Sequence, residues 1–417
     1  MANIFFGISS ESHIRNNIDK WVSIAGAPDI FSERDDHIEK YQMKLLGKYD
    51  LVSIDEALKR YPAADVWVTF PRVGNMPNML AEKLPPKRIH FLEADLEYRK
   101  GCSYLGNYII YGRKSFAPCS VAGRYPVMKT SGSIRERLAQ WQGDTTRLID
   151  DIRHERPNKC LDCHLINYGF WRTSVKLNTL SLAANNPGDI CNFRCVYCYS
   201  RKDLKHLKND RDGFSTYEIL QQLSEMPELD TEIFTIRLSN GEFCANKYYK
   251  EMIDILLKTK WKIHLSSNCS IYREKLASLM QTGRIFELVT SIDAGTPETF
   301  KKIKQVNSFY KVIENLKKYP VDKTRFIMKY IFLEGINDNE TDIDGFYEIV
   351  KELGGIAMLA NDIRTNFAPY TDTMRALTLR LVEKAKADGI HVVPNRSFLS
   401  PQDAKFINES YANAALA

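Results

Sequence analysis

Short apolar runs alternate with stretches of helical spacing between residues 171 and 395. Apolar residues that recur every three or four positions predict amphipathic helices, and short apolar runs bounded by polar turns predict buried strands. Six strand-and-helix units follow one another with short connections, which predicts a parallel sheet with right-handed crossovers. The expected strands cover residues 178–186, 232–240, 262–267, 287–294, 324–333 and 356–367.

The rest of the chain divides into three regions by the same criteria. Residues 1–98 alternate apolar runs with helical spacing, which predicts a small α/β domain. Residues 99–170 are richer in glycine, cysteine and aromatic residues, and their one clear helix pattern is capped by Ser131 or Ser133. Residues 396–417 are expected to form a C-terminal helical tail.

The composition is that of an ordinary globular protein, since 44 % of the 417 residues are hydrophobic and 26 % are charged. A net charge of +6 without a basic block argues against a nucleic-acid groove. The first residues lack the pattern of a signal peptide, and no apolar run approaches the ~18 residues of a membrane span. The nine cysteines are clustered, which favours metal ligation over disulfides, and we expect a cytoplasmic protein.

Three cysteines lie within eight residues, with the aromatic Tyr197 directly before the last; they are Cys191, Cys195 and Cys198. A structural zinc ion needs four protein ligands, and an ordinary [4Fe-4S] cluster needs four cysteines. A trio therefore indicates a cubane with one iron left open for a ligand that takes part in chemistry. The trio follows the first predicted strand, and parallel sheets carry their chemistry at the carboxyl ends of their strands.

Polar residues also follow the next predicted strands. They are Ser239–Glu242, Ser266–Cys269, Ser291–Asp293 and, beyond Lys329, Glu334–Asp338. Taken one by one, such residues are typical of helix caps and strand-end hydrogen bonds. Polar groups at the same end of successive parallel strands are costly to bury without partners, so the set indicates a functional face.

The cysteine trio and these strand ends, over about residues 175–390, resemble the radical S-adenosylmethionine (AdoMet) superfamily. The resemblance implies a partial (β/α)6 barrel of the TIM type. It also implies that the trio holds a [4Fe-4S] cluster whose open iron chelates AdoMet, and that a donor such as flavodoxin or ferredoxin supplies electrons. Asn240-Gly241-Glu242 resembles the family's Gly-Gly-Glu-Pro motif, which holds the methionine ammonium, although Asn240 replaces a glycine and Phe243 a proline.

The same resemblance implies further AdoMet contacts. Ser266, Asn268, Ser291 and Asp293 match polar strand ends that face the ribose and carboxylate, and Tyr197 is expected at the cofactor. The segment Glu334–Ile336 resembles a turn that lies against the adenine. In this family the reduced cluster delivers an electron to the sulfonium, and the resulting 5′-deoxyadenosyl radical takes a hydrogen atom from the substrate, so the cofactor carries the difficult chemistry.

Four further cysteines precede the predicted barrel: Cys102, Cys119, Cys160 and Cys163. Four thiolates are enough for a fully ligated [4Fe-4S] cluster, and they also suit a tetrahedral zinc ion. The spacing C-x9-G-x6-C followed by CxxC resembles the SPASM or twitch extension of the superfamily, which usually follows the barrel instead of preceding it. The resemblance implies an auxiliary cluster that accepts an electron; zinc and unligated cysteines are the alternatives. His164 is a spare ligand or a hydrogen-bond donor to a ligand.

Two cysteines remain on the predicted functional face, Cys244 after the Gly-Glu pair and Cys269 at the end of the third strand. Cys269 stands where the family usually has glycine, and a thiol there is a candidate hydrogen-atom donor to a substrate radical. The alternative is that both residues are small buried hydrophobes.

These features predict an enzyme that oxidises a C–H or alcohol carbon of a polar, sugar-like small molecule with help from the auxiliary cluster. The second hypothesis is modification of a peptide or protein side chain. Such enzymes often carry an N-terminal winged helix, whereas residues 1–98 alternate strands and helices. A third hypothesis, a non-catalytic electron carrier, is disfavoured because a carrier has no need of the Asn-Gly-Glu set.

Overall fold

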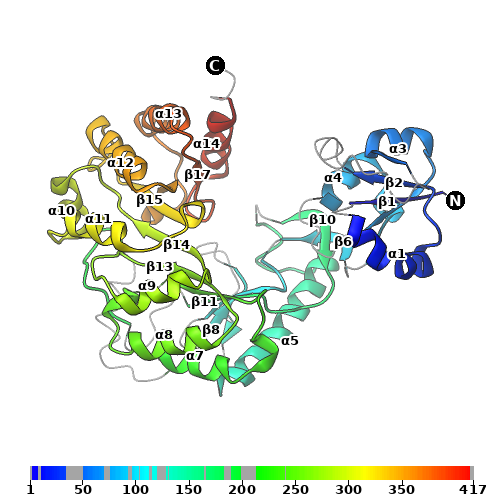
Figure 1. Cartoon of the computed structure of the whole chain (residues 1–417), viewed down its shortest axis with the longest axis horizontal. Helices are drawn as coiled ribbons and strands as arrows, with labels where there is room; N and C mark the ends of the chain where they lie inside the picture. Colours follow the sequence, from blue (N-terminus) through cyan, green and yellow to red (C-terminus); the bar gives the residue numbers. More distant parts are fainter. Residues whose placement is uncertain are drawn as a thin grey trace. The chain divides into compact units, whose positions relative to one another are not determined.

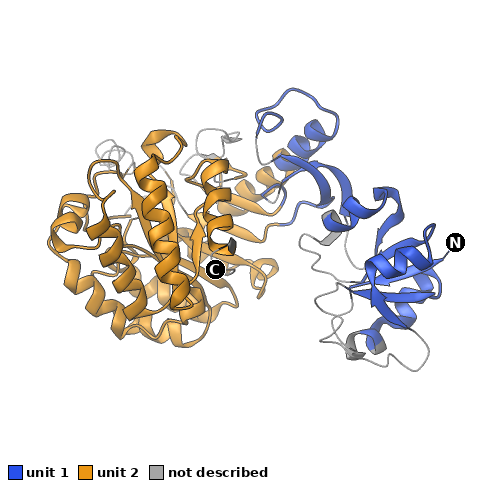
Figure 2. Cartoon of the chain, turned by 90° about the horizontal axis from the view of Figure 1, so that it is seen from above, with its two compact units in different colours: residues 1–106, 145–176 blue, residues 107–144, 177–417 orange. Residues whose placement is uncertain are grey.

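The computed structural model describes residues 2–7, 11–33, 50–69, 76–92, 96–102, 104–111, 115–119, 128–129, 131–163, 166–182, 189–198, 213–239 and 241–413. Contacts between residues divide the chain into two compact units, each made of two segments (Figure 2). Unit 1 comprises residues 1–106 and 145–176, and unit 2 comprises residues 107–144 and 177–417. The four domains expected from the sequence stay predictions, because a division by contacts assigns no role to a segment.

Unit 1 contains a five-stranded parallel sheet of the order β3-β2-β1-β4-β5. Its strands are β1 (Asn3–Phe6), β2 (Ile30–Glu33), β3 (Leu51–Ser53), β4 (Asp65–Val68) and β5 (Ile89–Phe91), and its helices are α1 (Glu11–Ala25), α3 (Ile54–Arg60) and α4 (Met76–Lys83). Separate apolar clusters are buried around Phe6 and around Phe5, on the two faces of β1, which explains its continuous apolar run. The expected alternation of strands and helices is confirmed, although the sequence pattern does not predict β3 or α3. Helical spacing over residues 35–49 also predicts a helix, but these residues lie outside the described ranges.

Unit 1 also contains an antiparallel pair, β6 (Leu96–Gly101) and β10 (Asn167–Arg172). Helix α5 (Ile134–Arg153) lies between these strands in the sequence. Of the two predicted caps, Ser133 forms a capping box: its Oγ accepts from the Glu136 N–H at 3.3 Å, and its own N–H donates to Glu136 Oε2 at 2.7 Å.

Unit 2 is built on a ten-stranded sheet of the order β17-β16-β15-β14-β13-β12-β11-β7-β8-β9 (Figure 1). The strands from β17 to β7 are parallel to their neighbours, and β8 and β9 add an antiparallel edge. The strands are β7 (Tyr108–Tyr111), β8 (Ser115–Ala117), β9 (Met128–Lys129), β11 (Thr179–Leu182), β12 (Thr235–Leu238), β13 (Lys262–Ser266), β14 (Ile285–Ser291), β15 (Phe326–Phe332), β16 (Ile356–Asn361) and β17 (Val392–Pro394).

Helices follow most of these strands in the sequence. They are α7 (Thr216–Ser224), α8 (Tyr249–Lys258), α9 (Glu274–Gln281), α10 (Pro297–Lys304), α11 (Phe309–Lys318), α12 (Glu340–Leu353), α13 (Asp372–Ala387) and α14 (Pro401–Asn413). Short 3-10 helices are η2 (Pro86–Arg88), η3 (Pro227–Leu229), η4 (Phe243–Ala245), η5 (Lys323–Arg325) and η6 (Ile363–Thr365).

The six predicted strand-and-helix units are confirmed in β11 to β16, and their parallel sheet agrees with a partial TIM-type barrel. The sheet is larger than expected, because β17 extends one edge and β7 extends the other. The apolar run Tyr108–Tyr111, expected to belong to the auxiliary region, pairs in parallel with β11. An open strand edge would leave backbone N–H and C=O groups without partners, and β7 fills that edge.

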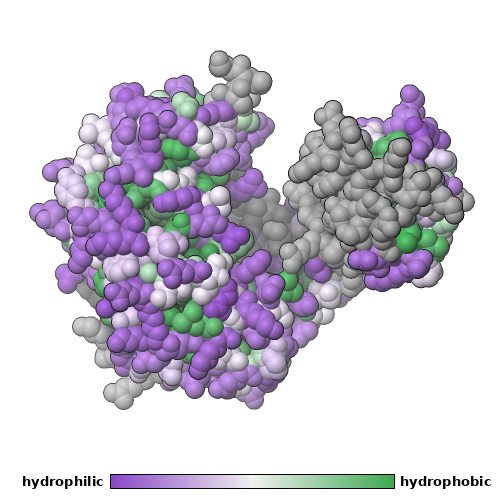
Figure 3. Space-filling view, in the orientation of Figure 1, coloured by the Kyte–Doolittle hydropathy of each residue, from purple (hydrophilic) through white to green (hydrophobic). Residues whose placement is uncertain are grey.

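The face of unit 2 that Figure 3 shows is mainly hydrophilic. Figure 3 shows polar residues over most of the visible face of α7 to α12, with apolar residues in small separate groups. Isolated apolar side chains on a surface are ordinary in folded proteins. No helix in the described ranges is long and apolar enough to cross a membrane.

Candidate active site

The loop that carries Cys191, Cys195 and Cys198 is attached to the last turn of α10. The Arg194 N–H donates to the Lys304 carbonyl at 3.1 Å, and the Val196 N–H donates to the Ile303 carbonyl at 2.9 Å. Within the loop, the Cys198 N–H donates to the Cys195 carbonyl at 3.1 Å, and all three cysteines are free thiols. Backbone hydrogen bonds thus hold the loop independently of any bound group.

A buried ion pair holds the same loop from the side of Tyr197. Asp293 and Lys304 are 0 % and 2 % exposed and form a salt bridge. The Tyr197 hydroxyl donates to Asp293 Oδ2 at 2.6 Å and accepts from Lys304 Nζ at 2.9 Å. Burial, with the Asp293 charge beside it, raises the pKa of Tyr197 well above its ordinary value, so the phenol keeps its proton. The predicted contacts of Tyr197 and Asp293 with AdoMet stay predictions.

The segment after β12 packs against the backbone that precedes Cys191. Gly241 has a φ of +63°, and a Cβ there would lie 2.6 Å from the Ile190 carbonyl oxygen. The next residue, Glu242, donates its N–H to the same oxygen at 2.7 Å. Only glycine allows this approach, because any side chain would collide with the backbone. Asn240, the first residue of the predicted motif, lies outside the described residues.

The carboxylate of Glu242 links the ends of β12 and β13. Glu242 is 1 % exposed, and it accepts from the Asn268 N–H at 2.6 Å, the Ser267 hydroxyl at 2.9 Å and the Cys244 N–H at 3.1 Å. Burial raises its pKa, and these three donors oppose the rise. The carboxylate is therefore committed to protein donors, and its predicted role toward the methionine ammonium stays a prediction.

Asn268 connects this network to the first cysteine. Its Nδ2 donates to Asn192 Oδ1 at 2.9 Å and lies 3.8 Å from the Cys191 sulfur. Ser270 completes a ring, since its Oγ donates to Asn268 Oδ1 at 2.7 Å and accepts from Asn192 Nδ2 at 2.8 Å. Hydrogen bonds to a ligand sulfur tune the metal group that the sulfur holds. Sequence reasoning found Asn268 but missed Asn192 and Ser270, because Asn192 is an unspecified position of the cysteine motif and Ser270 follows the polar strand end.

Ser266 and Ser291 end β13 and β14 and are partly exposed. In the strand pairing, Ser266 is opposite Val289, and Ser291 is opposite Lys329. Val289 and Ser291 are two residues apart on one strand, so these positions share one face of the sheet. The structure thus places both serines on one face, and their contacts with AdoMet stay predictions.

Cys244 and Cys269 are both enclosed by protein. They are 0 % and 1 % exposed, and the Cys269 sulfur lies 3.7 Å from the Ser267 carbonyl oxygen. Burial raises the pKa of Cys269 to about 12. This enclosure favours the alternative of a buried hydrophobe, while a hydrogen-atom donor role for Cys269 stays a prediction.

A cavity lies at the carboxyl ends of β11 and β12, beside the Gly241–Glu242 segment. Its lining includes Leu182, Asp189, Ser239, Glu242 and Asn246. Asp189 accepts from the Thr216 hydroxyl at 2.9 Å and from Asn246 Nδ2 at 3.4 Å. The cavity therefore has a lining of polar and apolar residues, and its polar groups are held in place at the strand ends where parallel sheets bind ligands.

The upstream cysteines occur in both units. Cys102 follows β6, and Cys160 and Cys163 form a turn in which the Cys163 N–H donates to the Cys160 carbonyl at 3.0 Å; these three belong to unit 1, and Cys119 belongs to unit 2. Burial raises the pKa of Cys102, and the Cys163 thiol adds to the rise. His164 and Gly112 lie outside the described residues. No three His, Cys, Asp or Glu side chains of the described ranges are arranged to hold a metal ion, and the ligand sets stay predictions.

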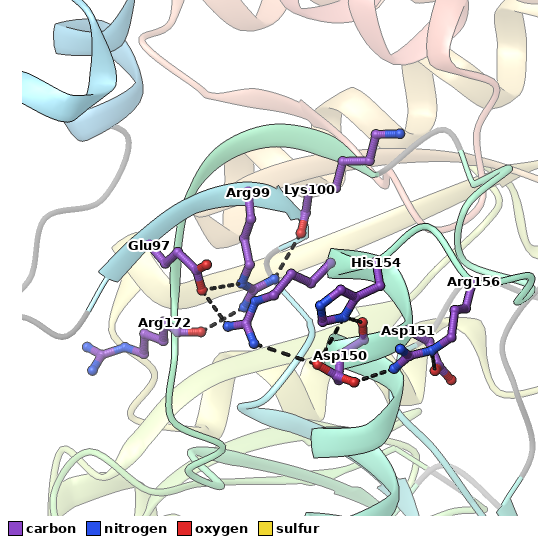
Figure 4. Close-up of polar contacts among 9 residues, drawn as sticks. Glu97, Arg99, Lys100, Asp150, Asp151, His154, Arg156 and Arg172 are labelled. Atoms are coloured by element: carbon purple, nitrogen blue, oxygen red, sulfur yellow. Dashed lines mark hydrogen bonds and ion pairs between the residues drawn. The ribbon is translucent and has the colours of Figure 1, made fainter.

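A network of charged residues surrounds the β6–β10 pair next to Cys102 (Figure 4). Arg99 is 5 % exposed and donates to the carbonyls of Lys100 at 2.9 Å and Arg172 at 2.8 Å. Its positive charge acts on Cys102 and opposes the rise in the pKa of that thiol. A cation beside a thiol favours the thiolate, which is the form that binds a metal.

The thiols of Cys191, Cys195 and Cys198 are likewise not arranged around a metal position. Their chemistry nevertheless fits an iron–sulfur cluster, because the loop offers three free thiols and Cys191 has an amide N–H beside it. The parallel sheet, with this loop beside the ends of its strands, is typical of an α/β enzyme. Residues 185–346 match the family model of the Radical SAM superfamily. The chain therefore carries a radical SAM enzyme domain, and such a domain implies a [4Fe-4S] cluster and AdoMet.

Comparison with named proteins gives partial matches. A Methanocaldococcus jannaschii protein named probable GTP 3′,8-cyclase is 26 % identical over 187 residues, which cover 44 % of this chain and 58 % of that protein. A Brachyspira hyodysenteriae protein named GTPase Obg is 25 % identical over 209 residues, which cover 48 % of this chain and 30 % of that protein. The match thus spans between 30 % and 58 % of the length of these relatives.

Similar solved structures include Streptococcus suis SuiB bound to its precursor peptide SuiA. That structure has 11 % sequence identity and a TM-score of 0.41, with 61 % of this chain and 62 % of that chain covered. A radical SAM methyltransferase from Sphaerobacter thermophilus has 15 % identity and a TM-score of 0.36, with 49 % and 63 % covered.

Proposed function

We propose that this enzyme cleaves AdoMet reductively at a [4Fe-4S] cluster held by Cys191, Cys195 and Cys198, and oxidises a polar small molecule. The observation that carries the proposal is the attachment of the cysteine loop. Backbone hydrogen bonds to α10, the Lys304–Asp293 pair and the Asn268 amide all act on one short segment. Such preorganisation is what a reactive cofactor requires of its protein.

The chain's own residues hold the cysteine loop and the neighbouring strand ends in position. When bound, the cluster and AdoMet together supply an electron and a 5′-deoxyadenosyl radical. Gly241 lets the strand end approach the loop, and Glu242 ties that strand end to β13. Tyr197, the residue before the third cysteine, ties the loop to the buried Asp293–Lys304 pair through its hydroxyl.

We further propose that Cys102, Cys119, Cys160 and Cys163 hold the auxiliary cluster that accepts the second electron of the oxidation. The nearness of Cys102 to Cys163 and the buried Arg99 beside Cys102 support a thiolate ligand set. A zinc ion on the same four thiols is the alternative, and it would leave the reaction redox-neutral.

A small-molecule substrate is favoured over a peptide by two observations. The sheet β3-β2-β1-β4-β5 of unit 1 is parallel throughout, whereas a winged-helix peptide clamp has antiparallel strands. Several relatives are also named for a reaction of GTP, a polar small molecule. Modification of a peptide side chain is the second proposal, and it predicts that a peptide library, not small metabolites, raises AdoMet turnover.

Iron and sulfide per chain after anaerobic reconstitution test the proposal directly, with the wild type and a Cys191/Cys195/Cys198→Ala variant compared. About eight irons falling to about four would support two cubanes, one on each cysteine set. About four falling to none would overturn the auxiliary cluster. Formation of 5′-deoxyadenosine by the reduced wild type is the second readout, and its absence would overturn AdoMet cleavage itself.

A further inference from the structure

Four charged or titratable side chains lie on one face of the unit 2 sheet, and none of them belongs to the predicted cofactor site. They are Arg237, His264, Glu287 and Lys329, the inner-face residues. On β15, Tyr330 packs against Phe346 of α12 with ring centroids 4.9 Å apart, so Tyr330 faces the helices. Adjacent residues of a strand point to opposite faces, and Lys329 therefore faces away from the helices.

The strand register places the other three on the same face as Lys329. Lys329 is paired with Ser291, and Glu287 is four residues before Ser291 on β14. Glu287 is paired with His264 on β13, and His264 is paired with Arg237 on β12. Paired residues of neighbouring strands point the same way, so four successive strands direct these side chains to the inner face of the barrel sheet.

Hydrogen bonds fix the protonation and orientation of three of these groups. Arg237 Nη2 lies 3.2 Å from His264 Nε2, and His264 Nδ1 contacts the Glu287 carboxylate. A guanidinium can only donate, so His264 Nε2 must accept, and the ring proton is on Nδ1, directed at Glu287. Burial lowers the pKa of His264, which agrees with a neutral ring. This hydrogen-bonded series, from Glu287 through His264 to Arg237, therefore holds the Arg237 guanidinium in one orientation.

Positive charge exceeds negative charge on this face. His264 is neutral, and Glu287 offsets one of the two cations, Arg237 and Lys329. Within the described part of the chain, Lys329 Nζ has no hydrogen-bond or ion-pair partner, although the residue is half-buried and burial lowers its pKa. Lys329 Nζ does lie over the Phe398 ring, 5.9 Å from its centroid, but an aromatic ring carries no net charge. Partial burial of a cation that has no counter-charge is costly, so the face has room for an anion.

The unbalanced charge lies near the cysteine loop. Lys329 is close enough to Cys195 and Asp293 for their charges to act on it. Ile331, the next residue on the same face of β15, donates its N–H to Asp293 at 2.8 Å and packs in the cluster that includes Val196 and Tyr197. An anion bound at Lys329 would thus lie on the same face as the proposed radical chemistry.

We propose that Arg237 and Lys329 form an anion subsite on the inner face of the sheet, which binds a carboxylate or phosphate group of the substrate. This inference rests on the proposed function, because it names the chemistry of the substrate that the same barrel takes. Arginine binds both groups through paired N–H donors, and lysine adds a point charge. His264 is a positioning residue, which acts on the anion through Arg237.

Calorimetric titration of the anaerobically reconstituted, AdoMet-loaded protein with pyrophosphate and, separately, with succinate tests the subsite. One of the two probes is expected to bind the wild type, and it identifies the group. Arg237→Met and Lys329→Met are expected to weaken that binding by roughly ten- to a hundredfold each, as loss of a charged hydrogen bond implies. Arg325→Met, which removes an exposed arginine on η5, is the matched control and should not change it.

A second pair of variants tests the positioning role. His264→Gln keeps an acceptor for Arg237 and a donor for Glu287, whereas His264→Leu removes both. The inference expects weak anion binding in His264→Leu and recovery in His264→Gln, a difference that a simple packing role would not produce. The subsite is overturned if neither anion binds the wild type, or if Arg237→Met and Lys329→Met bind the anion as tightly as the wild type does. Formation of 5′-deoxyadenosine by the wild type is measured separately, so the loss of the proposed function is distinguishable from the loss of the subsite.

Discussion

Replacing Lys304 by methionine should destabilise unit 2 far more than removing a surface lysine. Lys304 and Asp293 are 2 % and 0 % exposed, and Lys304→Met leaves the Asp293 carboxylate buried without its cation. Loss of one partner of a buried pair lowers the free energy of unfolding by about 3–5 kcal/mol. Asp293 keeps the Tyr197 hydroxyl at 2.6 Å and the Ile331 N–H at 2.8 Å, which places the expected value near 3 kcal/mol at the lower end of that range.

The matched control is Lys275→Met, because Lys275 pairs with Asp254 at 2.6 Å with side chains 35 % and 51 % exposed. Exposed pairs contribute at most about 1 kcal/mol. Anaerobic urea unfolding of both variants, followed by tryptophan fluorescence, gives the two values. A difference under about 1 kcal/mol between them would refute the reasoning. Adding Asp293→Asn to Lys304→Met removes the uncompensated charge and should recover part of the loss.

Three further outcomes are expected. Gly241→Ala should lower both the free energy of unfolding and the iron content, because the new Cβ would lie 2.6 Å from the Ile190 carbonyl oxygen. Gly283 also has a positive φ but has nothing within 4 Å, so Gly283→Ala should lower the free energy of unfolding by only about 1 kcal/mol. Equal effects of the two variants would contradict this reasoning. Asn268→Leu should shift the midpoint potential of the cluster measured by EPR-monitored titration, and an unchanged potential would exclude its N–H···S contact. Burial raises the pKa of the Cys269 thiol from 9.0 to about 12. The stability linked to this shift is fully present below pH 9.0 and is lost as the pH rises toward 12. The unfolding free energy of Cys269→Ala should therefore fall less steeply above pH 9 than that of the wild type, and parallel curves would argue against the buried thiol.

The sequence predicts the parallel sheet well, because its strands and helices have clear periodicity. The sequence does not predict that β7 belongs to that sheet, because the short apolar run Tyr108–Tyr111 does not indicate which strand it pairs with. Its pairing with β11 depends on the open edge of the folded sheet. The cysteine trio and Gly241–Glu242 are recognisable because their spacing is local.

Contacts between distant segments cannot be read from spacing. Lys304 belongs to an ordinary amphipathic helix, and only the folded chain brings it to Asp293 and Tyr197. A weak signal was present for the inner-face residues. A charged or titratable residue interrupts each of four consecutive apolar strands, as in Thr235–Leu238 with Arg237 and Phe326–Phe332 with Lys329. Such interruptions are unusual in strands of a parallel sheet, whose two faces are normally both apolar.

The pairing of β7 with β11 has a consequence for how the chain folds as it is made. Strand β7 is synthesised before its partner β11, which follows roughly 70 residues later. At ordinary rates of synthesis this interval takes about 3 to 15 seconds, during which β7 cannot form the pair. Over the same interval β1 to β5 already have all their partners, so their sheet can close first. Unit 2 has no such independence, because a chain started at residue 171 would expose the edge of β11 and invite aggregation. The catalytic sheet is thus completed by a segment that precedes it in synthesis, and the two units are interleaved along the gene and not strung end to end.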